Sequence, residues 1–253
     1  MKRRFISGLA AAAICLITLP ALAWNPADLE QVNSGISCPG ADLSGASLNG
    51  ADFTGLDLTG ANFEGSSLIG ARLAKAKLAG ANLRNTDLKR ANFGQADMKD
   101  ADLSGASAHY TQFGHTDLTG INGSGGDFFR TNFRGAKLVG ATFHNAKLQE
   151  ATLDAVEARK SDFSYASMPY SFLRNADISE CTFLGANLFR SRAEGVNATG
   201  TDFTGANLNS VLFYSATLSK AVFRNAGLDN ADLKDASLKG IAWDNSLRKN
   251  IKF

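Results

Sequence analysis

The residues of this chain with the clearest capacity for chemistry are acidic and amide side chains that recur at multiples of five. Each stands directly before a large apolar residue. Facing carboxylates can act as a general acid and base, and a ladder of carboxylates can bind calcium. Asp and Asn side chains also hydrogen-bond the backbone at turns, which explains why they recur wherever the repeat recurs. We therefore predict no catalytic residue and no enzyme activity from this set: Asp42, Asp52, Asp57, Asn62, Asn82, Asp102, Asp202, Asn207 and Asp232.

The sequence predicts no metal or cofactor site. Its three histidines, His109, His115 and His144, fall on different faces of the repeat described below, so they cannot gather as ligands. The glycine-rich stretch 123–126 is not followed by Gly-Lys-Ser/Thr and therefore is not a phosphate loop. The apolar pattern weakens at Ala108 and at this stretch, and again at Ala193 and Ala198. At the glycine-rich stretch 123–126 we expect a bend or bulge in the wall.

An apolar residue at every fifth position is the feature that must organise these side chains. Counting in fives from Leu43 to Trp243 gives 41 positions, of which 36 are Leu, Phe, Met, Ile or Trp. The residue two places earlier is nearly always small, and neither series contains a charged residue. A period of five fits neither a helix nor an alternating strand, and its length is typical of a solenoid whose units stack on one another.

The segments A-D-L-S-G (41–45), A-D-F-T-G (51–55), A-N-F-E-G (61–65), T-D-F-T-G (201–205) and A-D-L-K-D (231–235) carry a family resemblance. The chain resembles the pentapeptide-repeat proteins over roughly residues 41–245. The resemblance implies an all-β fold, a right-handed quadrilateral β-helix with four repeats per coil and about ten coils here. Four sides also agree with the sequence, since eleven of the twelve central Phe residues fall in two opposed columns and only Phe128 lies elsewhere.

The two ends of the chain predict export and capping. Residues 1–23 read as a signal peptide, with Lys2, Arg3 and Arg4 before a short apolar stretch and an Ala-x-Ala cleavage site ending at Ala23. Residues 24–40 should form a cap, with a short helix that begins after Asn25, and residues 246–253 a C-terminal tail. We expect an exported protein, in the periplasm or in a thylakoid lumen, with no stable membrane insertion after cleavage.

Charge and cysteines narrow the possible partners. Loss of the three N-terminal cations lowers the formal net charge from +2 to −1. A near-neutral chain of this kind is not expected to bind nucleic acid. Cys38 and Cys181 are separated by about seven coils, or roughly 34 Å, so they cannot form a disulfide within one chain. Cys181 falls at a small inward position. Cys38 is either a capped, partly buried residue or a thiol that links two molecules.

A row of aromatic and arginine residues follows the central positions of one column at 20-residue spacing. We call this set the aromatic face, and it is the candidate partner-binding or dimer surface because Tyr, Phe and Arg are enriched in interface hot spots. Its members are Tyr110, Phe129, Arg130, Tyr170, Phe189 and Arg190.

The favoured function is therefore a rigid, non-enzymatic scaffold that binds an unidentified protein or a second copy of itself. The alternative, drawn from family resemblance alone, is a DNA-mimicking protector of type II topoisomerases such as gyrase. The signal peptide and the near-neutral charge disfavour it. A hydrolase or lyase on a β-helix lacks a clustered acid, base or metal set.

Overall fold

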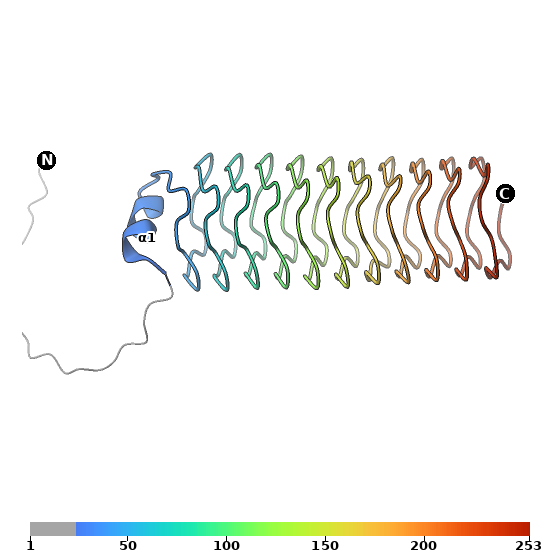
Figure 1. The fold of residues 1–253 in the computed structure, drawn as a ribbon, viewed down its shortest axis with the longest axis horizontal. Helices are drawn as coiled ribbons and strands as arrows, with labels where there is room; N and C mark the ends of the chain where they lie inside the picture. Colours follow the sequence, from blue (N-terminus) through green and yellow to red (C-terminus); the bar gives the residue numbers. More distant parts are fainter. Residues whose placement is uncertain (1–23) are drawn as a thin grey trace, which may run out of the picture.

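The computed structural model describes residues 24–253, and the predicted signal peptide 1–23 lies outside them. The described chain forms a straight rod of stacked coils with one helix, α1 (Pro26–Asn33), at its N-terminal end (Figure 1). No helix among residues 24–253 has the length and apolar character needed to cross a bilayer.

The wall of the rod is built from parallel bridges between residues 20 apart. These run without interruption from Asp42–Asn62 to Asp232–Lys252. In each rung the N–H of the large residue donates forward, as Leu43 does to the carbonyl of Asn62 at 2.7 Å, and the bridging residue donates back, as Asn62 does to Ala41 at 2.8 Å. A constant 20-residue step confirms four pentapeptides per coil.

Every corner of the coil is a turn closed by a residue in the left-handed conformation. From Gly35 to Asn250 each fifth residue has a positive φ, and 25 of these are not glycine. The turn is held by a bond such as that from the Ala46 N–H to the carbonyl of Leu43 at 3.1 Å. A positive φ at the third turn residue is the type II geometry. None of the 44 positions carries Val, Ile or Thr, as expected for side chains whose branching disfavours this conformation.

The interior is filled by stacked phenylalanine rings, and the two predicted columns are confirmed. Rings 20 residues apart lie nearly parallel, with centroids 5.2 Å apart for Phe143 and Phe163 and 4.8 Å for Phe163 and Phe183. The columns touch across the core, where Phe133 meets Phe143 edge-on at 5.8 Å. Trp243 ends the longer stack on Phe223 at 5.0 Å. All twelve central Phe residues are fully buried.

The predicted bend or bulge at residues 123–126 is wrong. The bridges Asp102–Asn122 and Asn122–Thr142 continue through the stretch. A Cβ added to Gly126 would lie 2.6 Å from the ring of Phe128, and one added to Gly123 would lie 2.9 Å from the ring of Phe143. The glycines therefore make room for Phe128, the one central Phe outside the two columns, so that the core stays filled while the wall stays straight.

The two ends of the rod differ. Asn25 caps α1 by accepting the Ala27 N–H at 3.0 Å, as predicted, and Val32 of the helix is fully buried against the first coil. Residues 246–253, expected as a separate tail, instead continue the ladder: Lys252 bridges Asp232 and donates to the carbonyl of Ala231 at 3.0 Å. The five-residue register persists here after the apolar pattern fades, because backbone pairing does not need a large inward side chain at every step.

Phe163→Ala should lower the free energy of unfolding by about 3–5 kcal/mol, because it opens a cavity between two stacked rings. Urea denaturation followed by circular dichroism measures this. Tyr170→Ala is the control, since Tyr170 is 43% exposed and its loss should change stability by no more than about 0.5 kcal/mol. Equal destabilisation by the two substitutions would show that the inward and outward assignments are wrong.

Lys220 tests the left-handed turns, because its φ is +61° and its side chain makes no ion pair within the described chain. Lys220→Gly should raise the free energy of unfolding by about 1 kcal/mol by relieving the left-handed conformation. Lys220→Val should lower it, since a β-branched residue fits this conformation poorly. Thermal unfolding of the two variants beside the parent measures both effects, and the same sign for both would contradict the turn assignment.

Candidate functional site: the aromatic face

The structure places the six predicted residues along one corner of the rod, on four of five consecutive coils. Backbone bonds join the neighbours directly: the Tyr110 N–H donates to the carbonyl of Phe129 at 3.0 Å, and the Tyr170 N–H to that of Phe189 at 2.9 Å. Gln149 and Glu150 occupy the coil between the two pairs. The face thus consists of two clusters separated by one polar coil.

The first cluster packs rings and a guanidinium together. Tyr110 and Phe129 meet edge-on with centroids 5.8 Å apart, and His109 contacts the same Phe129 ring, also at 5.8 Å. The Arg130 guanidinium lies 5.2 Å from the centre of the Phe129 ring, and its Nε donates to Glu150 at 2.7 Å. Hydrogen bonds to Glu150 and to the Tyr110 hydroxyl raise the pKa of Arg130 above its usual range.

The second cluster repeats this geometry three coils later. Tyr170 and Phe189 meet edge-on at 5.9 Å, and the Arg190 guanidinium lies 5.1 Å from the centre of the Phe189 ring. Both tyrosines are about two-fifths exposed, at 41% for Tyr110 and 43% for Tyr170, while Phe129 and Phe189 are half-buried. Arg190 differs from Arg130 in one respect: no carboxylate among residues 24–253 pairs with it.

Turn conformation distinguishes this corner from the other three. From Arg90 to Arg190 its left-handed position carries a large residue on six consecutive coils, with no glycine. At each of the other corners glycine returns after at most three coils. Sequence periodicity identified the aromatic residues here, but Glu150, which holds Arg130, was missed as a member. The 20-residue spacing could have identified Glu150, because it places this residue beside Arg130 on the next coil.

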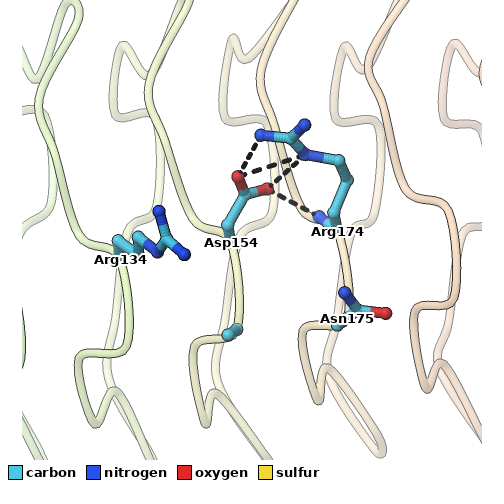
Figure 2. Close-up of a pocket in the computed structure, with 5 residues that line it drawn as sticks. Arg134, Asp154, Arg174 and Asn175 are labelled. Carbon is cyan, nitrogen blue, oxygen red and sulfur yellow. Dashed lines mark hydrogen bonds and ion pairs between the residues drawn. The ribbon is translucent and has the colours of Figure 1, made fainter.

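A group of charged residues outside the aromatic face lines an open pocket of about 300 Å³ (Figure 2). Its members are Arg134, Asp154 and Arg174. The buried Asp154 carboxylate accepts hydrogen bonds from three nitrogens of Arg174. The donors are the side-chain Nε at 3.1 Å, a terminal guanidinium nitrogen, and the backbone N–H at 2.9 Å. The reason is local: the turn N–H of Arg174 has no Asp or Asn two residues earlier, where Phe172 stands. This group therefore has a structural role.

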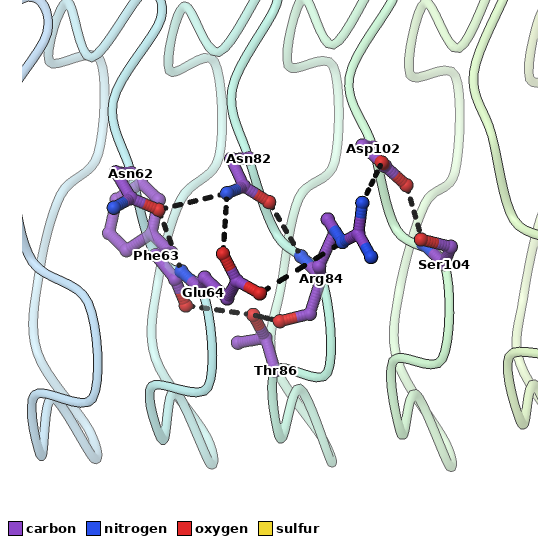
Figure 3. A network of polar contacts seen from close by, with 8 residues as sticks. All are labelled: Asn62, Phe63, Glu64, Asn82, Arg84, Thr86, Asp102 and Ser104. Carbon is purple, nitrogen blue, oxygen red and sulfur yellow. Dashed lines mark hydrogen bonds and ion pairs between the residues drawn. The ribbon is translucent and has the colours of Figure 1, made fainter.

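The nine Asp and Asn residues considered for catalysis all bond the backbone at turns, as predicted. Each accepts the N–H of the residue two places later, as Asn62 does from Glu64 and Asn82 from Arg84, both at 3.1 Å (Figure 3). Asn82 also donates to Asn62 at 3.0 Å, so the side chains form a ladder along the rod. The remaining bonds of this type lie at Asp42, Asp52, Asp57, Asp102, Asp202, Asn207 and Asp232.

The remaining candidates for chemistry are isolated. Within the described part of the chain no three His, Cys, Asp or Glu side chains approach closely enough to hold a metal ion. Cys38 and Cys181 are both free thiols. Burial raises the pKa of the Cys181 thiol to about 12, and burial together with the nearby Asp28 carboxylate raises the pKa of Cys38. Neither is therefore an activated nucleophile.

The family model for pentapeptide repeats matches the chain in eight copies, over segments between residues 34 and 241. This covers well over half of the chain. The chain is a pentapeptide-repeat protein. The match and the 20-residue ladder together give the right-handed β-helix of that family.

Solved pentapeptide-repeat structures resemble this one. HetL of the cyanobacterium Nostoc sp. strain PCC 7120, involved in heterocyst differentiation regulation, is 24% identical over 87% of this chain and 92% of its own, with a TM-score of 0.50. QnrB1, a plasmid-mediated fluoroquinolone resistance protein, is 20% identical over 73% and 91%, with a TM-score of 0.47. A thylakoid-lumen protein of Arabidopsis thaliana is 36% identical over 39% and 69%, with a TM-score of 0.23. No curated protein sequence gives a significant match.

Asp154→Ala should lower the free energy of unfolding by about 1–3 kcal/mol, because it leaves the Arg174 N–H and guanidinium without their acceptor. Adding Phe172→Asn should restore most of the loss, since a side-chain amide at that position would accept the same N–H from its own turn. Chemical denaturation of the single and double variants measures both. Additive destabilisation by the two changes would contradict the proposed role of Asp154.

Proposed function

We propose that this pentapeptide-repeat protein is a non-enzymatic, exported scaffold that binds a protein partner, or a second copy of itself, through the aromatic face. The observation that carries the proposal is the series of six large residues, Arg90 to Arg190, at the left-handed position of a corner that has no glycine from residue 90 to residue 250. Tyr, Phe and Arg are the side chains that dominate binding energy at protein interfaces. A solenoid of this length offers them on a rigid support.

The backbone conformation strengthens this argument. A left-handed residue other than glycine costs roughly 1–2 kcal/mol, so a long run of such residues is unfavourable for the fold alone. Glycine occupies the same corner at Gly50 and Gly70, which indicates that the turn accepts it. Tyr110, Arg130, Tyr170 and Arg190 are therefore best explained by what their side chains do outside the rod.

Export is supported by the sequence before the rod. Three cations, a stretch of about 15 apolar residues and an Ala-x-Ala site follow one another before Trp24. The proposed destination is the periplasm, or the thylakoid lumen in a photosynthetic cell. Dispersed carboxylates and unactivated thiols agree with a protein that needs no cofactor and performs no catalysis.

Charge placement favours a scaffold over a DNA-mimicking topoisomerase protector. A DNA mimic needs a continuous acidic surface, whereas cations here alternate with the carboxylates along the coils. Lys99, for example, lies between Asp97 and Asp117, with nitrogen–oxygen distances of 3.4 and 3.3 Å. The formal net charge of residues 24–253 is −1, because only Lys2, Arg3 and Arg4 are removed from a chain of net charge +2.

A pull-down from an envelope or lumen extract of the source organism tests the proposal. The mature chain should capture a partner, or a tagged second copy of itself, that a Tyr110/Phe129/Tyr170/Phe189→Ser variant fails to capture. A Tyr165/Leu184/Tyr214→Ser variant is the matched control, since these exposed apolar residues lie at other corners. Equal capture by all three proteins, or no capture by any, would remove the assigned role of the aromatic face.

A further inference from the structure

The aromatic face presents the same three-residue arrangement twice. Tyr110, Phe129 and Arg130 recur as Tyr170, Phe189 and Arg190, each 60 residues later in the sequence. The geometry recurs as well: the Tyr–Phe centroid distances are 5.8 and 5.9 Å with interplanar angles of 85° and 81°, and the Arg–Phe distances are 5.2 and 5.1 Å. A surface repeated by translation fits a ligand that also repeats by translation.

The separation of the two arrangements limits what that ligand can be. Three coils at an inter-strand spacing of about 4.8 Å place them about 14 Å apart. Four residues of an extended chain span about 13.5 Å, and residues i and i+4 of a strand point to the same side. One face of an α-helix returns after seven or eleven residues, about 10.5 or 16.5 Å, and a polyproline helix returns after about 9 or 19 Å. Only the extended chain matches in both distance and side.

The charges of the two arrangements are not equivalent. Arg130 is held by Glu150, with the Nε–Oε2 distance at 2.7 Å, so its cluster offers mainly the rings of His109, Tyr110 and Phe129. Arg190 has only its contact with the Phe189 ring, and no acid within residues 24–253 pairs with it. An unpaired guanidinium beside exposed aromatic rings is a site for a carboxylate. The first cluster thus suits an apolar side chain and the second an acidic one.

We propose that the occupant of the aromatic face is an extended segment of a partner protein, lying along the rod axis, with an apolar side chain at the Phe129 ring and an acidic side chain four residues away at Arg190, three coils further along. This inference rests on the proposed function and specifies its partner. Glu150 then acts as a specificity residue, because it neutralises Arg130 and prevents that end from accepting a second acid.

Binding of labelled twelve-residue peptides, measured by fluorescence anisotropy, tests the inference. Each peptide carries one Leu and one Glu in a Ser/Thr background, in either order, separated by two, three, four, five or six positions. Affinity should peak at a separation of four, about tenfold above three and five, which point the two side chains to opposite sides. Arg190→Gln should reduce the optimum to the level of the other peptides. A flat profile, or an optimum that Arg190→Gln leaves unchanged, would overturn the proposal.

Glu150→Gln supplies a variant whose predicted effect is a gain, which loss of folding cannot imitate. By freeing Arg130 it should raise the affinity for a peptide with Glu at both positions, four apart, by about tenfold over the parent. No gain would contradict the assigned role of Glu150. If a partner is captured through the aromatic face but the peptides show no optimum, the extended-segment inference fails and the proposed function stands. If capture ignores the aromatic face, the proposed function fails as well.

Discussion

The whole rod depends on the backbone hydrogen bonds that join each pentapeptide to the coils before and after it and close its turn. The large residue and the left-handed residue donate to the next coil, the bridging residue donates to the previous one, and the small residue closes the turn. The remaining N–H, that of the residue between the large and the left-handed residue, has no backbone acceptor, and at many turns a side chain accepts it. Asp or Asn at the bridging position supplies this side chain, as Asp42 does for Ser44 at 3.2 Å.

This requirement explains side chains that would otherwise suggest chemistry. At three turns where the bridging residue cannot accept, an Asp or Asn one coil earlier accepts the N–H instead: Asp154 accepts from Arg174, Asn209 from Asp229, and Asp229 in turn from Lys249. Buried hydroxyls at the small inward position follow a similar logic, as when Thr111 donates to the carbonyl of Leu88 at 2.7 Å. Many of the carboxylates among residues 24–253 are thus accounted for by the hydrogen bonds they accept from the backbone of the wall.

Much of this could be predicted from the sequence, because a period of five constrains every coil alike. The register, the phenylalanine columns and the backbone role of Asp42 and its equivalents all follow from that period, while the capping helix follows from the helix-start signal at Asn25. The features that could not be predicted are contacts in which a residue of one coil makes up for a missing group in another. Gly123 and Gly126 read as a weakness because the ring that fills their space, Phe128, belongs to another column. The bond from Arg174 to Asp154 and the pairing of Arg130 with Glu150 each join residues 20 apart, and their geometry emerges only when the coils are stacked.

A repeat fold places function in its departures from the repeat, since the repeating positions are already committed to the ladder and the core. The left-handed turn position is the one least committed, because its side chain enters neither. Replacing glycine there weakens the turn, so selection for stability alone would favour glycine along each corner. A single corner that has no glycine from residue 90 to residue 250, and carries one arrangement of Tyr, Phe and Arg twice at a fixed translation, is therefore a feature that the stability of the rod does not explain.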